Sequence, residues 1–330
     1  MHNLQNASAL PPAADNGPIL QWILILLATN ASTMKPYAIG VDIGGTRVKF
    51  SVLDAATGEL WRQLTMPTQD GQRVDGQPAW AVAIRDFVRE EERQRGGAQA
   101  VGIAAPGLAA MDNRSVAKMP GRLAGLEGLD WTDWLGRPAR VLNDAHAALL
   151  GECWCGAARG LQQVVLLTLG TGVGGAILID GKLLQGHCGR AGHLGHLTVN
   201  ADGPATIAGM PGGLDVIIGN ATVEERSGGR FTSTAELAAA VSTGDALASD
   251  VWQRSLYLLA CGIASLINVL DPEAVIIGGG IAEVGEMLFE PLAQHLAQVE
   301  WRPHQKATPI LPAQLGEWAG TYGAAKFALG

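Results

Sequence analysis

The sequence is poor in cysteine, aromatic residues and charge. It contains four Cys in 330 residues, aromatic side chains make up 5% of it, and charged side chains make up 16%. No two Cys have the CxxC spacing of a zinc site, and four are too few for a disulfide framework in a chain of this length. A reducing, cytoplasmic location is therefore expected.

Basic residues are also scarce. The chain has 23 Lys and Arg against 31 Asp and Glu, its net charge is −8, and the basic residues form no run. Because an acidic chain repels phosphate backbones, nucleic-acid binding is disfavoured. The remaining composition, 48% hydrophobic with 44 Gly, predicts a folded chain with a large core and many tight turns. The length suits two domains of ordinary size.

Residues 1–33 differ from the rest of the chain, because they contain no Lys or Arg. Their apolar run, residues 19–28, is too short to span a hydrocarbon core of roughly 30 Å. They also lack the basic flank of a secretory signal. We interpret 1–33 as an N-terminal extension outside the fold, translated from an upstream start codon. A weak signal or anchor and a docked helix are the alternatives, and no membrane association is expected.

From Met34 onward, apolar strands alternate with helices, which predicts an α/β protein. The helix near 80–95 has one apolar face and a charged back, and the helix near 246–270 is long and apolar. Other expected elements are a helix over 144–156 and strands over 37–42, 48–53, 100–104, 139–142, 164–169, 176–179, 274–277 and 309–311.

An internal repeat relates two glycine turns. Gly44-Gly45-Thr46 follows the first strand, and Gly170-Thr171-Gly172 follows a later one; a return strand ending in Asp comes after each turn. This pattern predicts two halves of similar design that face each other across a cleft. Because the N–H groups of a tight glycine turn bind anions, two such turns could hold a polyphosphate from both sides. Two plain hairpins are the alternative.

Acidic residues beside these turns indicate the chemistry. Asp42 lies just ahead of the first turn, where a carboxylate would repel phosphate unless Mg²⁺, held through water, lay between them. Asn143-Asp144 ends a strand and opens a helix, so Asp144 could be only an N-cap. It could instead be a general base that takes the proton of a substrate hydroxyl attacking the γ-phosphate of ATP. The sequence has no GxxxxGK[ST], which excludes a P-loop protein, and no GxGxxG after the first strand.

Several motifs occur together in a fixed order. They are Asp42-Ile43-Gly44-Gly45-Thr46, Ala105-Pro106-Gly107, Asn143-Asp144-Ala145, Leu169-Gly170-Thr171-Gly172-Val173-Gly174-Gly175, Gly192-x-x-Gly195-His196, Gly278-Gly279-Gly280 and Ala319-Gly320-x-x-Gly323-Ala324-Ala325. By these motifs, nearly all of residues 38–330 resembles the ROK (repressor, open reading frame, kinase) family of sugar kinases in the actin-like ATPase superfamily. The resemblance implies two actin-like, ribonuclease H-like α/β domains around a central cleft. The smaller would cover 34–142, with helix 318–330 packed on it, and the larger 143–317.

The resemblance also implies ligands and roles. ATP and Mg²⁺ would be the cofactors, a small sugar the substrate, and the protein a homodimer. The implied residues are Asp144 as catalytic base; Asn143 and Gly107 as substrate contacts; Gly44, Gly45, Thr46, Lys49, Gly170, Thr171 and Gly172 as phosphate contacts, with Asp42 holding Mg²⁺ through water; and Gly279 and Gly280 beside the adenosine.

The sequence departs from the family pattern in the substrate loop. The family has Glu-x-Gly-His, whose Glu binds sugar hydroxyls, whereas this chain has His193-Leu194-Gly195-His196. We expect His193 and His196 to contact the sugar, with Asp215 as a further candidate and a core role for His196 as the alternative. The family's Asn-containing segment is also absent, and the nearest stretch is 118–122. Arg122 and Glu127 could contact substrate, with a solvated loop as the alternative.

The three Cys of the family's zinc motif are absent as well. The matching stretch, residues 206–215, contains none, so no structural zinc is expected. We expect this loop to be held by Pro211, by glycine turns, and by packing of Met210 and Leu214. A substitute zinc site built from His187, Cys188, His193 and His196 is the less favoured alternative.

These observations predict an ATP-dependent sugar kinase acting on a hydroxyl of a hexose or N-acetylhexosamine. A non-catalytic, regulatory sugar-binding member of the same family is one alternative. A polyphosphate-dependent glucokinase is another, although it would need a basic channel that the 23 Lys and Arg do not suggest. A transcriptional repressor is disfavoured, because no basic helix precedes Asp42.

Overall fold

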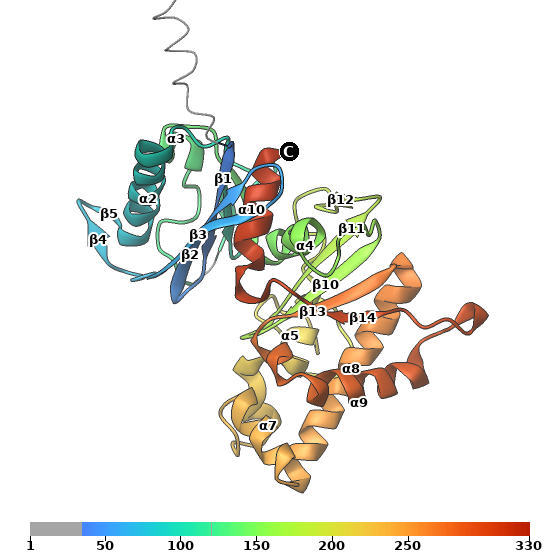
Figure 1. The fold of residues 1–330 in the computed structure, drawn as a ribbon. Coiled ribbons are helices and arrows are strands. Elements are labelled where there is room, and N and C mark those ends of the chain that lie inside the picture. Colours follow the sequence, from blue (N-terminus) through green and yellow to red (C-terminus); the bar gives the residue numbers. More distant parts are fainter. Residues whose placement is uncertain (1–34, 120) are drawn as a thin grey trace, which may run out of the picture. The chain divides into compact units, whose positions relative to one another are not determined.

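The computed structural model describes residues 35–119 and 121–330, so the interpretation of 1–33 lies outside the described residues. Two five-stranded sheets with flanking helices make up the unit Pro36–Gly330 (Figure 1). The first sheet has the order β3-β2-β1-β6-β9, and the second has the order β12-β11-β10-β13-β14. The predicted α/β fold class is confirmed.

The two sheets repeat one design. In each, a central strand pairs antiparallel with the strand that follows it and parallel with a later one. The first sheet comprises β1 Tyr37–Ile43, β2 Arg47–Asp54, β3 Leu60–Pro67, β6 Ala100–Ala105 and β9 Arg140–Asn143. The second comprises β10 Val164–Leu169, β11 Val173–Ile179, β12 Lys182–Leu183, β13 Ala274–Gly278 and β14 Ile310–Pro312. The internal repeat of the sequence thus corresponds to two halves of equal strand order.

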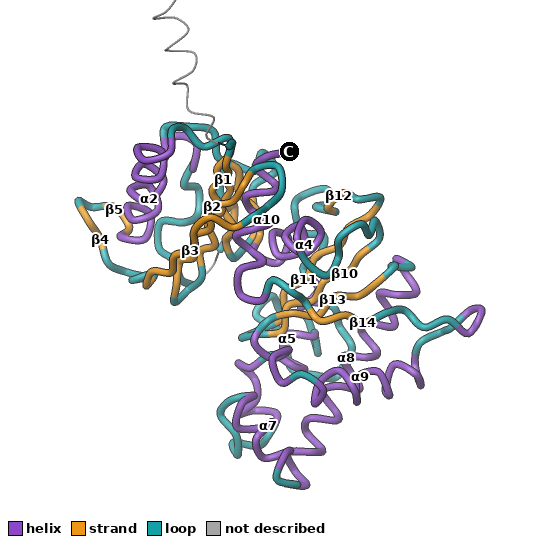
Figure 2. Tube along the Cα trace, in the orientation of Figure 1, coloured by secondary structure: helices purple, strands orange, loops and turns teal. Residues whose placement is uncertain are grey.

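The remaining elements are helices and short hairpins (Figure 2). The hairpins pair β4 Arg73–Val74 with β5 Gln77–Pro78, and β7 Leu108–Ala109 with β8 Val116–Lys118. The helices are α2 Ala79–Arg95, α3 Trp131–Leu135, α4 Asp144–Cys155, α5 Leu214–Ile218, α6 Val223–Arg226, α7 Thr234–Ser242, α8 Ala246–Leu270, α9 Glu286–Val299 and α10 Ala319–Leu329. The 3₁₀ turns are η1 Leu194–His196, η2 Asn220–Thr222, η3 Gly280–Val284, η4 Pro303–Gln305 and η5 Gly316–Trp318.

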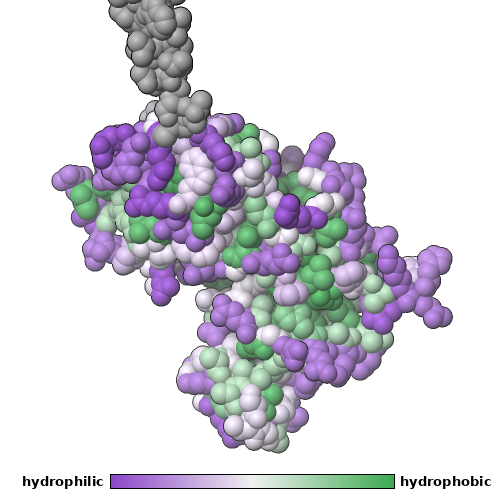
Figure 3. All heavy atoms as spheres, viewed as in Figure 1, coloured by the Kyte–Doolittle hydropathy of each residue, from purple (hydrophilic) through white to green (hydrophobic). Residues whose placement is uncertain are grey.

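Two helices show how the sequence pattern becomes structure. Helix α2 buries its apolar face in the core of the first half, and hydrophilic side chains dominate the surface over it (Figure 3). Helix α8 is, within the described ranges, the one helix long and apolar enough to cross a membrane by length and composition alone. Its buried side chains, among them Leu259 and Ile263, belong to the same core as Leu167 of β10 and Ile277 of β13. Its apolar character therefore serves the core of the second half.

Helix α10 lies against the first sheet and against α4 (Figure 1). Gly40 of β1 and Gly102 of β6 are partners in the parallel register, and a Cβ on either would overlap a backbone carbonyl of α10. A Cβ on Gly323 of α10 would overlap the carbonyl of Ala147 in α4 in the same way. Because only glycine fits these contacts, α10 packs closely between the sheet and the helix that begins at Asp144.

Candidate active site

A cleft of about 800 Å³ is lined by residues from both halves of the chain. Among the residues predicted from the sequence, it is lined by Gly45, Thr46, Gly107, Asn143, Asp144, Gly170, Thr171, Gly172, His193, His196, Asp215 and Gly279. Gly280 lines a neighbouring cavity together with Gly170 and Thr171. Asp42, Gly44 and Lys49 belong to β1, the first turn and β2, next to the cleft.

The two glycine turns are closed in a similar way, although the first has one residue more than the second. The N–H of Gly44 donates to the carbonyl of Arg47 at 2.9 Å and closes the turn between β1 and β2. The N–H of Gly170 donates to the carbonyl of Gly172 at 2.9 Å and closes the turn between β10 and β11. The exposed tips of both turns line the cleft, which is the arrangement that the repeat predicts. Two such tips can donate backbone hydrogen bonds to one polyphosphate.

At the start of helix α4, one residue caps the helix and another lies in the cleft. The sequence alone left open whether Asp144 was the cap or the base. Oδ1 of Asn143 accepts from the N–H groups of Ala145 at 3.0 Å and His146 at 3.3 Å, and Nδ2 of Asn143 donates to the carbonyl of Gly107 at 3.0 Å. Asn143 is therefore the N-cap, and Asp144 is the first helical residue. The side chain of Asp144 lies in the cleft, where Oδ1 also accepts from the N–H of Ala145 at 2.8 Å. The helix start accordingly does not need Asp144 as its cap.

Two carboxyl groups near the first turn hold their protons more tightly than usual. Desolvation raises the pKa of Asp144, although its side chain opens into the cleft and water reaches it. Burial, together with the negative charge of Asp144, raises the pKa of Asp42 from 3.8 to about 7, against the opposing charge of Lys49. A divalent cation near both carboxylates would relieve this repulsion, and their oxygens are ligands that Mg²⁺ prefers. The residues present therefore fit the predicted Mg²⁺.

Lys49 and the start of α10 complete the surroundings of Asp42. Lys49 faces Asp42 across the β1–β2 ladder, and its Nζ donates to the carbonyl of Glu317 at 2.8 Å. A Cβ on Gly320 would lie 3.0 Å from Cγ of Asp42, so α10 closes over this carboxyl. The position of Asp42 is thus fixed by three separate segments of the chain.

Asp42→Asn is expected to stabilise the ligand-free protein at alkaline pH. Because the folded state raises the pKa of Asp42, the stability it contributes is complete below pH 4 and is lost as the pH rises through about 7. Removing the charge should therefore raise the free energy of unfolding by roughly 1–3 kcal/mol at about pH 8 and change it little at about pH 4. Urea unfolding at both pH values measures this. Asp86→Asn on the surface of α2 is the matched control, and a gain that does not grow with pH would contradict the prediction.

Two histidines, His193 and His196, line the cleft, and the ring of His146 lies 5.7 Å from that of His193. Burial and the neighbouring His193 lower the pKa of His146 to about 4, and its neutral ring donates from Nε2 to the carbonyl of Ala191 at 2.9 Å. Burial also lowers the pKa of His193, while the charge of Asp144 opposes this effect. Nε2 of His193 and Nδ1 of His196 are buried and have no hydrogen-bond partner among the described residues. Nε2 of His193 therefore has unused hydrogen-bonding capacity beside the cleft, whereas Nδ1 of His196 lies at ion-pair distance from Asp215.

Asp215 connects the substrate loop to the second glycine turn. Its Oδ1 accepts from the N–H of Val173 at 2.5 Å, directly after the turn. Its Oδ2 lies 3.8 Å from Nδ1 of His196. A Cβ on Gly172 would lie 2.8 Å from Oδ1, so the turn packs closely on this carboxylate. One oxygen of Asp215 is thus used to position the phosphate turn, which leaves the other for His196 or a ligand.

The loop over residues 206–215 is held differently from the expectation. Leu214 is fully buried as predicted, but Met210 is 43% exposed and Ile207 is 88% exposed, so the predicted packing of Met210 is wrong. The N–H of Thr206 instead donates to the carbonyl of Met210 at 2.8 Å, and the N–H of Met210 donates to Oγ1 of Thr206 at 3.3 Å. These bonds form a tight hairpin whose tip, residues 207–210, cannot reach the core.

No group of three or more His, Cys, Asp or Glu is arranged to hold a metal ion within residues 35–119 and 121–330. The alternative zinc set around His187 and Cys188 therefore gains no support. That the protein lacks a structural zinc stays a prediction.

A second cavity of about 300 Å³ adjoins the second glycine turn. Gly280 was predicted from the sequence to lie beside the nucleoside, whereas Asn220, Thr234 and Ile281, which also line this cavity, were not predicted. Oδ1 of Asn220 accepts from the N–H of Thr234 at 2.7 Å, and Oγ1 of Thr234 is buried without a partner in the described chain. Ser233 is a residue type that often caps a helix, so the start of α7 could be predicted from the sequence. The position of that start beside the cavity could not. The mixture of apolar wall and free polar atoms beside a phosphate turn suits a nucleoside.

The repeated sheets and the facing turns define a two-domain protein of the actin-like ATPase fold. The chain belongs to the ROK family, whose model matches residues 38–330. It is 33% identical to a glucokinase of Thermotoga maritima, over 87% of this chain and 95% of that protein. It is 29% identical to an N-acetyl-D-glucosamine kinase of Yersinia enterocolitica, over 87% of this chain and 97% of that protein.

A solved structure shows the same similarity. A ROK-family glucokinase from Streptomyces griseus, in complex with glucose and AMPPNP, is 30% identical to this chain and superposes with a TM-score of 0.70. The match covers 88% of this chain and 99% of that one. The family membership that the sequence motifs predict is therefore confirmed, and the three relatives named above are sugar kinases.

Proposed function

We propose that this protein is a sugar kinase that transfers the γ-phosphoryl group of ATP to a hydroxyl of a hexose or N-acetylhexosamine. The observation that carries the proposal is the position of Asp144 in a cleft lined by both phosphate turns and by the His193 loop. Desolvation raises the pKa of Asp144, which makes its carboxylate a stronger base than an ordinary aspartate. The named relatives, which are glucose and N-acetylglucosamine kinases, support the substrate class.

Each group of residues in the cleft has its own role in the proposed reaction. Asp144 takes the hydroxyl proton as the sugar oxygen attacks phosphorus, and Asn143 holds the start of α4 that carries this carboxyl. The backbones of Gly45-Thr46 and Gly170-Thr171-Gly172 bind the phosphates, while Gly279 and Gly280 lie beside the nucleoside. Mg²⁺, held by Asp42 through water, would neutralise phosphate charge. Catalysis thus depends mainly on positioning and electrostatics.

We also propose how the chain is organised around this reaction. The smaller domain covers 34–142 with α10 packed on it, and the larger covers 143–317. The sugar binds between them, in contact with Gly107, His193 and His196, and exclusion of water from the closed cleft limits hydrolysis of ATP. A homodimer in the cytoplasm is the proposed state of the protein.

A screen for ADP release tests the proposed function. The purified protein is incubated with ATP and Mg²⁺ and a panel of hexoses and N-acetylhexosamines, with parallel reactions that contain EDTA. We expect saturable, Mg²⁺-dependent ADP release with at least one sugar. Sugar binding by calorimetry without ADP release from any member of the panel would instead identify a non-catalytic sugar-binding protein. Turnover with polyphosphate in place of ATP would identify the polyphosphate-dependent alternative.

A further inference from the structure

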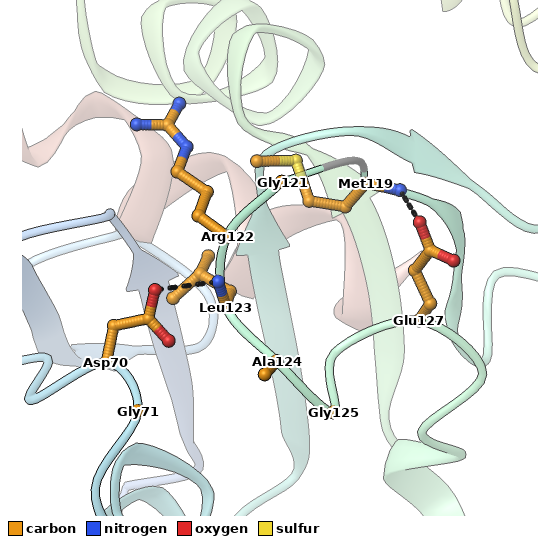
Figure 4. A pocket seen from close by; sticks show the side chains of 9 residues that line it. All are labelled: Asp70, Gly71, Met119, Gly121, Arg122, Leu123, Ala124, Gly125 and Glu127. Atoms are coloured by element: carbon orange, nitrogen blue, oxygen red, sulfur yellow. Dashed lines mark hydrogen bonds between the residues drawn. The ribbon is translucent and has the colours of Figure 1, made fainter.

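Arg122 is a cation without a partner at the edge of the cleft. Its side chain lines both the 800 Å³ cleft and an adjoining hollow of about 610 Å³. It forms no hydrogen bond or ion pair with any residue in the described ranges. Figure 4 shows its guanidinium directed away from Asp70 and Glu127, the two carboxylates that line the same hollow. The guanidinium is therefore available to an anionic ligand.

The two neighbouring carboxylates bind the backbone on either side of Arg122. Oδ2 of Asp70 accepts from the N–H of Leu123 at 2.8 Å, and Oε1 of Glu127 accepts from the N–H of Met119 at 2.5 Å (Figure 4). Each of these oxygens is therefore already engaged by a backbone donor. The two bonds hold the backbone at Met119 and at Leu123, and neither of these oxygens is bonded to the guanidinium.

The residue after Arg122 holds the segment in an unusual conformation. Leu123 has a φ of +57°. This left-handed region is unfavourable for a large non-glycine side chain. The Leu123 side chain is 1% exposed and packs in the core of the first half. A buried anchor thus maintains a strained backbone, and residues held in this way cluster at functional sites.

The guanidinium lies next to the first phosphate turn. A Cβ on Gly45 would lie 3.1 Å from Nη1 of Arg122, so the two groups are in packing contact. The charge of Arg122 also reaches Asp144, whose pKa it lowers against the larger effect of desolvation. Arg122 is therefore close both to one of the two turns that bind phosphate in the proposed function and to the proposed base.

We propose that Arg122 binds the phosphoryl group while it passes from the nucleotide to the sugar. The proposal rests on the kinase function proposed above. The sugar oxygen forms a bond to the γ-phosphorus and gives its proton to Asp144. The bond from phosphorus to the bridging oxygen breaks, and that oxygen leaves on ADP with the electron pair. The guanidinium donates N–H groups to the non-bridging oxygens throughout, because its planar fork matches a phosphoryl group and it keeps its own protons.

Arg122→Ala, Arg122→Lys and the control Lys118→Ala test this role. Lys118 lies on the same segment, is 67% exposed and pairs with Glu127, so its removal makes the same change of charge away from the cleft. We expect Arg122→Ala to lower kcat by about 10²-fold or more, with the KM for sugar and the affinity for ADP nearly unchanged. Arg122→Lys should be intermediate because its charge remains without the fork. Added guanidinium should restore part of the Arg122→Ala rate, and Lys118→Ala should retain activity.

Three results would overturn the proposal. An unchanged kcat in Arg122→Ala would show that the guanidinium does not contact the reacting group. A raised KM for sugar at unchanged kcat would make Arg122 a sugar contact. If the wild-type protein phosphorylates no sugar of the panel, the proposed kinase function is wrong, independently of Arg122. The role of Arg122 is then tested by binding of ADP with fluoroaluminate, which mimics the phosphoryl group during transfer. Equal binding by wild type and Arg122→Ala would overturn it, whereas a loss of about tenfold or more, with ADP binding alone unchanged, would support it.

Discussion

Asp144→Asn is expected to lower kcat by about 10²–10⁴-fold, the usual effect of removing a general base. Asparagine has nearly the same shape but cannot accept the hydroxyl proton. The helix start should remain intact, because Asn143 supplies the N-cap. Sugar affinity should therefore stay within a few-fold of wild type. Initial rates of ADP release measure kcat, and calorimetry measures sugar binding.

The control for this variant is Asp250→Asn, which removes one exposed carboxylate from α8. It should leave both quantities unchanged. The wild-type rate should also fall as the pH drops through the raised pKa of Asp144, because the protonated carboxyl is no longer a base. A near-normal kcat in Asp144→Asn would assign the proton transfer to another group.

His193→Glu is expected to change the ranking of sugars by about ten- to hundredfold in kcat/KM, since a mispaired buried polar group costs about 1–3 kcal/mol. Glutamate accepts hydrogen bonds from two neighbouring hydroxyls, so the variant should shift toward glucose-like substrates. The neutral imidazole of His193 offers one donor and one acceptor. It therefore suits a sugar that presents an acceptor, such as an acetamido carbonyl. Rates over the sugar panel measure the ranking, and the affinity for ATP should not change.

His187→Glu is the matched control, because His187 is exposed on the segment that leads to the same loop. It should leave the ranking unchanged. If His193→Glu and His193→Ala both keep the wild-type ranking, His193 does not determine specificity. Asp215 would then be the next candidate, through the oxygen that Val173 does not engage.

Features with a strong apolar period could be predicted from the sequence, and features that depend on the exposed surface could not. The two central strands and their glycine turns were predictable because each is a short buried run that ends in Gly. Strand β3 was not predicted, because it is an edge strand whose residues are all partly or fully exposed. The packing of Met210 was predicted wrongly because hydrophobicity does not reveal which residues form the tip of a hairpin.

Some residues of the candidate site could also be predicted from the sequence, and others could not. Asp144 and the glycine turns could be identified because their chemistry depends on local order along the chain. The roles of Arg122 and Thr234 could not, because each depends on which distant segment the side chain faces. For Arg122, the deciding facts are the left-handed backbone at Leu123 and the two carboxylates used by backbone donors. Neither the backbone conformation nor these hydrogen bonds could be predicted from the sequence.

The close packing of α10 on the first sheet has a consequence for synthesis of the protein. The strands of the second sheet, from β10 to β14, and helix α8 that packs on them all come from one continuous stretch of the chain, residues 164–312. The first sheet is made earlier, but Gly40 and Gly102 face a helix that begins only at Ala319. One face of β1 and β6 therefore stays uncovered until α10 has been translated, near the end of the chain. A nascent chain of this protein thus depends on protection of its first half for longer than its second.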